Sequence, residues 1–252
     1  MRYVRFRDDA GDVRRGEWTG DEIVAYPNEG SRFVATTETY DPDGVEILPP
    51  TDPSKVVCIG KNYADHAAEM DSEVPDRPLI FLKGPNTVAA HGDTLPLLPG
   101  KERIDYEAEL GVVIGERCRN VAADDVDDAI AGYTCFIDVS NRDDQRQETN
   151  WIRGKAFDDS APIGPVVASP EDVPDDARVQ CRLNGETVQD ADLSLLIFSI
   201  PELIEEITTY MTLEPGDVIA TGTPEGVGEL SPGDTVEVEV EGVGTLEVDF
   251  EA

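Results

Sequence analysis

The stretch that most constrains this chain covers residues 104–114 and reads IDYEAELGVVI. Its apolar side chains recur at every second position, which is the period of a β-strand. The opposite face then carries Asp105, Glu107 and Glu109, with the two glutamates about 7 Å apart at Cα for a rise of roughly 3.3 Å per residue. Neighbouring like charges on one strand face repel each other. The pattern therefore indicates either a divalent-cation site or a solvated acidic face, and spacing alone leaves both open.

The net charge of the chain bears on its partners and its habitat. The 252 residues include 20 lysines and arginines against 54 aspartates and glutamates, a formal net charge of -34. Such a charge makes nucleic acid and an anionic membrane poor partners. The acidic excess is dispersed and lysine is scarce, a composition that we expect of a halophilic organism. At ~1 M salt the Debye length is about 3 Å and self-repulsion is screened, so we expect instability at low salt.

The length of the chain and the position of its proline-rich break predict one main domain with a small appendage. A proline-rich break at residues 49–53 separates a small N-terminal domain or arm, residues 1–50, from a main domain over residues 55–252. The first residues lack the apolar run of a signal peptide, and no stretch of about 20 apolar residues could span a bilayer. We therefore expect a cytoplasmic protein. The cysteines form no CxxC pair and so no zinc or redox motif; they are Cys58, Cys118, Cys135 and Cys181.

A histidine and a glutamate lie three residues apart after the short apolar strand predicted at residues 55–60. On a helix, His66 and Glu69 would face the same side and could touch. Such a pair can hold a water molecule and remove its proton, with the carboxylate orienting the imidazole. An exposed helix with an incidental histidine is the plainer alternative. The other histidine, His91, lies in a loop without a nearby partner and is predicted to have no catalytic role.

A third candidate ligand interrupts the strand-like run of residues 132–140. Asp138 is flanked by apolar and small residues, where a carboxylate is costly unless it is paired or binds a metal. Together with Glu107 and Glu109 it would form an all-oxygen site, which favours Mg²⁺, Mn²⁺ or Ca²⁺ over zinc. Three carboxylates and one divalent cation leave about one negative charge, so an anionic substrate would need local cations. Lys155 and Arg142 are the candidates for that role.

Other stretches predict ordinary elements around these residues. Asn184 and Gly185 separate two strand-like runs and are typical of a β-hairpin turn. A capping box at Ser199 and Glu202 begins an amphipathic helix that we expect to pack on a sheet. The closing hairpin at residues 235–250 carries glutamates at alternate positions. The chain therefore also builds acidic strand faces where no site is indicated.

Two further polar residues lie at the ends of apolar strands. Thr223 belongs to a glycine-rich loop whose backbone N–H groups and hydroxyl could approach a carboxylate or enolate oxygen. Lys83 ends another short strand and is either a surface lysine or an anion-binding residue.

Taken together, these stretches resemble the fumarylacetoacetate hydrolase family. Seven short motifs occur in family order over residues 55–250. They are GKNYADH at 60–66, FLK at 81–83, DYEAEL at 105–110, ID at 137–138 with Arg142 and Gln145, GKAFD at 154–158, FSIP at 198–201, and the segment 213–228. The resemblance implies a mainly β fold with some α (α+β), built as a rolled mixed β-sheet with few helices, and a homodimer.

The resemblance also implies a role for each candidate residue. The carboxylates Glu107, Glu109 and Asp138 would bind Mg²⁺ or Mn²⁺. Lys155 would stabilise developing negative charge, and His66 with Glu69 would activate water. Four further side chains would contact a small anionic 2-oxo acid substrate: Lys83, Arg142, Gln145 and Thr223.

The expected chemistry follows from stabilising an enolate. A 2-oxo acid would chelate the cation through its carboxylate and ketone oxygens, and the cation would stabilise the enolate formed at the neighbouring carbon. With a 2,4-dioxo acid such as an acylpyruvate or fumarylpyruvate, activated water would attack the distal carbonyl and cleave the C–C bond. The presence of both His66 and Glu69 favours this hydrolysis. The same enolate would serve a 2-hydroxyhepta-2,4-diene-1,7-dioate-type isomerase, an oxaloacetate decarboxylase or a 2-oxo acid dehydratase; a non-catalytic, cation-stabilised binding protein is the alternative from another class.

Overall fold

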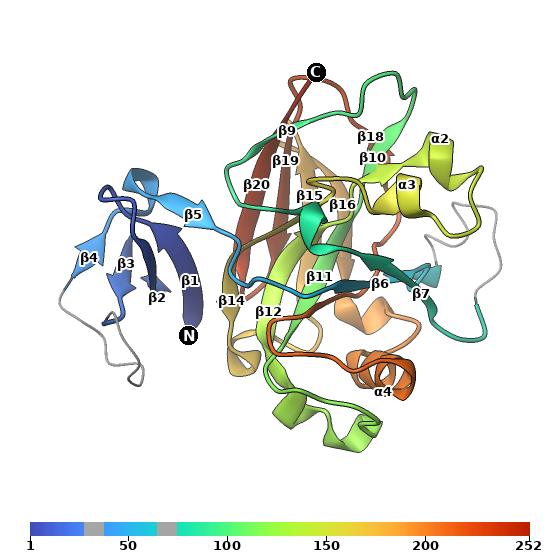
Figure 1. Cartoon of the computed structure of the whole chain (residues 1–252), viewed down its shortest axis with the longest axis horizontal. Helices are drawn as coiled ribbons and strands as arrows, with labels where there is room; N and C mark the ends of the chain where they lie inside the picture. The colour runs from blue at the N-terminus through green and yellow to red at the C-terminus, as the bar shows by residue number, and fades with distance from the viewer. Residues whose placement is uncertain (28–37, 65–74) are drawn as a thin grey trace.

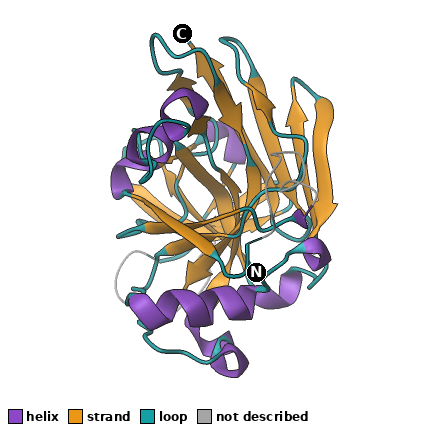
Figure 2. Ribbon diagram, turned by 90° about the vertical axis from the view of Figure 1, so that its right-hand side faces the viewer, coloured by secondary structure: helices purple, strands orange, loops and turns teal. Residues whose placement is uncertain are grey.

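The computed structural model of the chain describes residues 1–27, 38–64 and 75–252. Strands account for most of its regular structure. Figure 1 shows β1–β5 on one side and a larger body of sheets on the other. Figure 2 shows the strands forming that body with the helices at its margins. The expected fold class, mainly β with mixed sheets and few helices, is confirmed.

The strands described here form three sheets. The largest has twelve strands. Ten of them follow one another in the order β4 (Thr39–Tyr40), β3 (Glu22–Ala25), β2 (Val13–Thr19), β1 (Arg2–Arg7), β14 (Ala161–Ala168), β12 (Ile130–Ile137), β11 (Ala108–Ile114), β17 (Val218–Ala220), β6 (Val56–Gly60) and β7 (Leu79–Lys83). The other two are β5 (Glu46–Leu48), which pairs with β1, and β8 (Val88–Ala89), which pairs with β14. The five-stranded sheet is β16 (Glu186–Asp192), β15 (Arg178–Leu183), β19 (Thr235–Val240), β20 (Gly244–Glu251) and β9 (Thr94–Pro96). The smallest is β13 (Ser140–Asn141), β10 (Ile104–Tyr106) and β18 (Gly228–Glu229). Three neighbouring pairs are parallel, namely β17–β6, β14–β8 and β20–β9, so the sheets are mixed.

The helices in the described part of the chain are short. The α-helices there are α2 (Arg142–Gln145), α3 (Ile152–Lys155) and α4 (Ile200–Tyr210). Single 3₁₀ turns are η1 (Pro42–Gly44), η2 (Pro85–Thr87), η3 (Ala123–Asp125), η4 (Asp127–Ala129), η5 (Pro170–Asp172) and η6 (Leu193–Leu195). None of these helices is long and apolar enough to cross a membrane.

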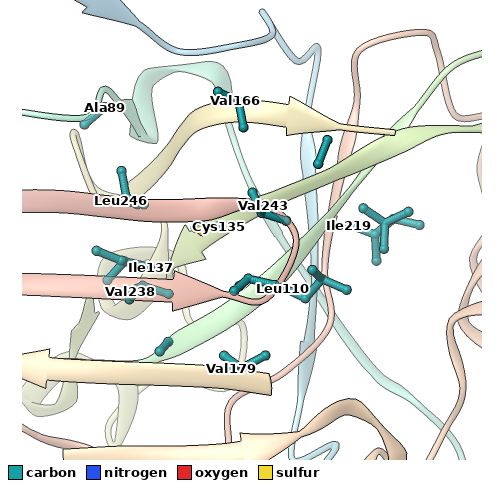
Figure 3. Close-up of a cluster of buried hydrophobic side chains, with 14 of the residues drawn as sticks. Ala89, Leu110, Cys135, Ile137, Val166, Val179, Ile219, Val238, Val243 and Leu246 are labelled. Carbon is teal, nitrogen blue, oxygen red and sulfur yellow. The ribbon is translucent and has the colours of Figure 1, made fainter. Parts of the chain in front are cut away.

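The hydrophobic core lies between the large sheet and the five-stranded sheet. Figure 3 shows Leu110 of β11 and Ile137 of β12 facing Val179, Val238 and Leu246 of the other sheet. The alternating apolar residues predicted for the central strand all lie in this core; they are Tyr106, Ala108, Leu110, Val112 and Ile114. The residues that alternate with them along β11, such as Glu109, therefore point to the other face of the sheet.

The central stretch forms two strands where the sequence predicted one. β10 ends at Tyr106 and pairs with β13 and β18, whereas β11 begins at Ala108 and pairs with β12 and β17. Glu107 lies between them, and its backbone oxygen accepts a hydrogen bond of 2.9 Å from the N–H of Asp138. The chain thus changes sheets at the first predicted ligand, and this change brings the small sheet and α2 next to the large one.

Two sets of hydrogen bonds help to join the N-terminal strands to the main body. β1 pairs with β14 through Arg2 opposite Ala168 and Tyr3 opposite Val167. The connecting segment is then held by Asp217, whose carboxylate accepts hydrogen bonds from the backbone and hydroxyl of Ser54 at 2.9 and 2.7 Å. The predicted division into residues 1–50 and 55–252 stays a prediction.

Several local predictions are confirmed. Asn184 and Gly185 adopt positive φ values of 52° and 81° in the turn between β15 and β16, as a type I′ hairpin requires. Ser199 and Glu202 form the capping box of α4. The buried residues of that helix are Leu203, Ile204, Ile207 and Thr208. The cysteines are free thiols, three of them buried.

Candidate metal centre

Three carboxylates converge on one face of the large sheet. Glu109 belongs to β11, Glu107 immediately precedes it, and Asp138 follows β12 directly. Because Ala108 is the antiparallel partner of Ile137, Asp138 lies beside Glu107. One oxygen from each carboxylate lies within 4.8 Å of the others, and all three residues are buried. Two oxygens on opposite sides of one Mg²⁺ ion, each at about 2.1 Å, would be about 4.2 Å apart, so carboxylates this close can bind a single ion after small side-chain movements.

The electrostatics of the three carboxylates favour a cation between them. Burial raises the pKa of Glu109 well above its usual range, and the charges of Asp138 and Glu107 raise it further, against a 2.7 Å hydrogen bond from the N–H of Gly222. Asp138 Oδ1 is buried and accepts no hydrogen bond from the described residues, although Lys83 Nζ lies 2.8 Å away as an ion-pair partner. A buried carboxylate oxygen without hydrogen bonds and an all-oxygen donor set both fit Mg²⁺ or Mn²⁺.

Lys155 contacts two of these carboxylates. Its Nζ donates hydrogen bonds to Glu107 Oε2 at 2.6 Å, Asp138 Oδ2 at 2.6 Å and Ser140 Oγ at 2.5 Å. Burial alone would lower the pKa of Lys155, but Asp138 and Glu107 outweigh it and the pKa is raised. The side chain is therefore a fixed ammonium ion that partly neutralises the carboxylates.

Lys83 lies beneath Asp138 and does not reach the cavity. Its side chain is fully buried, and its Nζ donates hydrogen bonds to the carbonyl oxygens of Val139, Lys155 and Ser160 and to the Ser160 hydroxyl, in addition to the ion pair with Asp138. An ammonium group has three hydrogens to donate. These contacts use all three, so the geometry favours a positioning role for Lys83 over the expected contact with substrate.

Arg142 connects the triad to α2 and to the small sheet. Its guanidinium donates to Glu107 Oε1 at 2.5 Å, to Asp105 Oδ2 at 2.8 Å and to Gln145 Oε1 at 2.8 Å. Burial acts to lower the pKa of Arg142, but Glu107 and Asp105 outweigh it and the pKa is raised. Arg103 contacts the second oxygen of Asp105 at 2.9 Å. The orientation of Glu107 is thus fixed by a charged chain that reaches the protein surface.

The glycine-rich loop covers the other side of the triad. Gly222 has a φ of 100°, and a Cβ at this position would lie 2.8 Å from the Cβ of Asn62. Only glycine permits this conformation and approach, which bring the N–H of Gly222 to Glu109. Thr223, the next residue, is buried and faces the same cavity as the carboxylates.

A cavity of about 210 Å³ opens above the carboxylates. Of the residues predicted for the site, all three carboxylates, Arg142, Gln145, Lys155 and Thr223 line it. His66 and Glu69 lie outside the described residues. His91 does not line the cavity; its Nδ1 accepts a hydrogen bond of 3.0 Å from the N–H of Glu247, and burial lowers the pKa of His91. The remaining lining residues are Ile59, Gly60, Lys61, Phe81, Arg146 and Trp151.

Three residues of the site did not stand out in the sequence. The sequence places Asp105 on the acidic face and in the DYEAEL motif without indicating a role for it, yet it binds Arg142 and Arg103. Ser140 follows Asp138 by two residues, the spacing that places two side chains on one strand face, and this signal could have identified it. Gln189 is brought to the site by the distant β15–β16 hairpin, and no local pattern indicates it.

Comparison with known proteins identifies the relatives of this chain. Residues 55–251 match the model for the C-terminal region of fumarylacetoacetate (FAA) hydrolase. The chain belongs to the fumarylacetoacetate hydrolase family. An oxaloacetate tautomerase, YisK of Bacillus subtilis, is 43% identical over 247 residues, which cover 90% of this chain and 82% of YisK. An uncharacterised protein of Archaeoglobus fulgidus is 48% identical over 202 residues, 80% of each chain.

Solved structures of the family share the same fold. A 5-carboxymethyl-2-hydroxymuconate delta-isomerase from Mycobacterium smegmatis superposes with a TM-score of 0.89 at 38% identity, over 100% of this chain and 98% of the isomerase. A fumarylpyruvate hydrolase from Pseudomonas aeruginosa, in complex with Mn²⁺ and pyruvate, gives a TM-score of 0.75 at 32% identity, over 82% of this chain and 91% of the hydrolase. The relatives thus include tautomerases, isomerases and hydrolases.

Proposed function

We propose that this chain is a divalent-metal-dependent enzyme that interconverts the keto and enol forms of a 2-oxo acid, with a 2-oxo dicarboxylate such as oxaloacetate as the first candidate substrate. The observation that carries this proposal is the buried triad of Glu107, Glu109 and Asp138 at the base of a cavity that also holds the Lys155 ammonium. The similarity to the oxaloacetate tautomerase YisK over most of both chains supports the reaction and the substrate class.

The cation fits the triad and would supply the Lewis acid. Mg²⁺ or Mn²⁺ held by the three carboxylates would polarise the 2-oxo group and its neighbouring carboxylate, which makes the adjacent C–H more acidic. The fumarylpyruvate hydrolase relative was solved with Mn²⁺ and pyruvate, a 2-oxo acid, which supports both the metal and the ligand class.

The residues of the chain provide charge, orientation and proton transfer. With a divalent cation present, the triad together with Lys83 and Lys155 carries about one positive charge, which attracts an anionic substrate. Lys155 also stabilises negative charge that develops on the substrate oxygen. Three side chains line the cavity and would orient the carboxylate groups of the substrate; they are Arg142, Gln145 and Thr223. The family resemblance assigns water activation to His66 with Glu69, and for the keto–enol reaction we propose that the same pair accepts the proton from carbon.

Hydrolysis of an acylpyruvate is the second candidate function. It uses the same enolate as the leaving group and additionally requires water to attack the distal carbonyl. The fumarylpyruvate hydrolase relative favours it, at a lower identity than the tautomerase. The isomerase reaction on 2-hydroxyhepta-2,4-diene-1,7-dioate, named for a relative from Mycobacterium marinum at 35% identity, shares this enolate as well.

A panel of 2-oxo acids tests this proposal. With Mg²⁺ or Mn²⁺, we expect the protein to accelerate the loss of enol-oxaloacetate absorbance more than the loss of fumarylpyruvate, and we expect EDTA to remove this acceleration. Pyruvate release distinguishes decarboxylation from tautomerisation. If no 2-oxo acid reacts in molar KCl while the metal still raises the melting temperature, the protein is a cation-stabilised binding protein and the enzyme proposal fails.

The acidic composition supports a second proposal, that the protein is halophilic, and the family resemblance supports a third, that it is a homodimer. Because screening at ~1 M salt reduces the Debye length to about 3 Å, we expect the melting temperature to rise between about 0.1 M and 3 M KCl. Light scattering on the same samples measures the mass of the folded species. A melting temperature that falls with KCl would contradict the salt proposal, and a mass near 27.4 kDa at high salt would contradict the dimer.

A further inference from the structure

Gln189 lies on β16 of the five-stranded sheet, yet its side chain contacts Ala108, which lies between two of the carboxylates, and Thr223, which lines the cavity. The residue is 1% exposed and buries a polar amide in the core between the two sheets. A buried amide is stable only when its oxygen and its two N–H groups have partners. The partners of Gln189 come from the ligand-bearing strand and from the glycine-rich loop, both of which are distant from it in sequence.

The orientation of this amide is fixed by the nature of its partners. Its Oε1 faces the backbone N–H of Ala108, a group that can only donate, at 3.0 Å. Its Nε2 faces the carbonyl oxygen of Pro224 at 2.9 Å, a group that can only accept, and that of Glu225 at 3.4 Å. The reversed amide would oppose donor to donor and acceptor to acceptor, so the assignment follows from the hydrogen bonds themselves.

The second N–H of the amide determines the polarity of Thr223. Nε2 lies 2.8 Å from Thr223 Oγ1 and donates to it. A threonine hydroxyl has one hydrogen, and an oxygen that accepts from Gln189 must point that hydrogen elsewhere. No residue in the described ranges accepts a hydrogen bond from it, and Thr223 lines the cavity above the carboxylates. The hydrogen is therefore available to an acceptor in the cavity.

We propose that Gln189 is a positioning residue that makes the Thr223 hydroxyl a hydrogen-bond donor into the cavity, so that the substrate atom bound at Thr223 is a hydrogen-bond acceptor, for which a carboxylate or enolate oxygen is best suited because it is charged. The inference rests on the proposed function in taking this cavity as the binding place of a 2-oxo acid. A substrate group that can only donate, such as an ammonium, would gain nothing from the oriented hydrogen.

The same amide also fixes the distance between Thr223 and the metal ligands. Ala108, which Gln189 binds, is the residue between Glu107 and Glu109, and the neighbour of Thr223, Gly222, donates to Glu109. The ligand strand and the donor loop are thus held as one unit. A substrate that contacts the cation and Thr223 together meets groups whose separation is set before it binds, which reduces the entropy lost on binding.

A double-mutant cycle on oxalate binding tests the proposal without turnover. Oxalate is a non-reacting analogue of a 2-oxo acid whose oxygens only accept hydrogen bonds, and its affinity for the Mn²⁺-loaded protein can be measured by calorimetry. We expect Thr223→Val to weaken oxalate binding roughly 10-fold or more, the loss of one hydrogen bond to a charged oxygen. Gln189→Met should weaken it by a smaller factor, because the Thr223 hydroxyl remains but is no longer oriented. The double variant should bind within about 3-fold of Thr223→Val, because Gln189 acts through that hydroxyl.

A second variant separates polarity from packing. Gln189→Glu has the same shape but places an acceptor beside Thr223, which turns the hydroxyl hydrogen away from the cavity. We expect it to weaken oxalate more than Gln189→Met does, while the affinity for Mn²⁺ without oxalate changes less than about 3-fold. The melting temperature of each variant shows that it is folded.

The possible outcomes separate this inference from the proposed function. Equal losses for Gln189→Met in the wild-type and Thr223→Val backgrounds would reduce Gln189 to a packing residue and overturn the inference. Unchanged oxalate binding in Gln189→Glu would do the same, even if Gln189→Met fails to fold. A wild-type protein that binds Mn²⁺ but not oxalate would instead refute the proposed function, and this inference with it.

Discussion

Replacing Glu109 with glutamine is expected to weaken Mn²⁺ binding and, in the metal-free protein, to increase stability. Glu109 offers a ligand oxygen, and losing a direct ligand should exceed the roughly 10- to 100-fold effect of losing an outer partner. Among the described residues the carboxylate accepts a single hydrogen bond, from Gly222, which the glutamine oxygen can also accept. Removing a buried charge that has no ion-pair partner in the described part of the chain is expected to stabilise the metal-free fold by about 1–2 kcal/mol.

The opposite signs of these two effects make the result specific. Calorimetric titration with Mn²⁺ gives the affinity, and urea unfolding in EDTA at fixed KCl gives the free energy of unfolding. Glu247→Gln is the matched control, because it makes the same change of charge at an exposed strand position of β20. We expect this control to change Mn²⁺ affinity less than about 2-fold and stability by less than about 0.5 kcal/mol. Unchanged Mn²⁺ affinity in Glu109→Gln would show that the triad is not the metal site.

The core-facing pattern of the central strand could be predicted because it is a local property. Side chains alternate between the faces of a strand, so Ala108, Leu110 and Val112 necessarily face the core together and Glu109 faces away. Asp138 was recognisable for a similar reason, since a carboxylate in an apolar run requires a partner. In both cases the signal comes from residues that are close to one another in the sequence.

The strand break at Glu107 could not be predicted from the same pattern. Alternation continues unchanged from Tyr106 to Ala108, although the two residues belong to different sheets. The break is determined by pairing with β13 and β18, which lie about 35 and 120 residues further along the chain. Acidic alternation was a weak guide for a different reason, because with 54 acidic residues the chain also places glutamates on the outward faces of β19 and β20.

The burial and the contacts of the Lys83 side chain also could not be predicted from the local sequence. A lysine at the end of an apolar strand has the same local sequence whether its ammonium faces a cavity or lies beneath one. The partners that decide this are Val139 and Ser160, which are 56 and 77 residues away in the sequence. Sequence could therefore identify the residue as part of the site and could not specify what it touches.

Replacing Lys83 with methionine is expected to destabilise the fold strongly. Methionine fills a similar volume but leaves Asp138 without one of its two lysine partners, and the carbonyl oxygens of Val139 and Ser160 lose a donor. Removing one partner of a buried ion pair costs about 3–5 kcal/mol. We therefore expect a loss of this size in the free energy of unfolding, measured by urea titration of the metal-free protein at fixed KCl.

A positioning role and a substrate-binding role for Lys83 predict different results. If the ammonium only positions Asp138, Lys83→Met lowers stability and Mn²⁺ affinity, and the ratio of oxalate affinity to pyruvate affinity stays the same because neither ligand touches the lysine. If it contacts substrate, that ratio changes and stability falls by less than about 1 kcal/mol, the effect typical of exposed charges. Lys101→Met is the matched control, since Lys101 forms an ion pair with Asp144 at 2.5 Å in a more exposed position. A stability loss for Lys83→Met no larger than that of Lys101→Met would mean that the buried ion pair does not support the fold, and the substrate-binding role would then be the better account of Lys83.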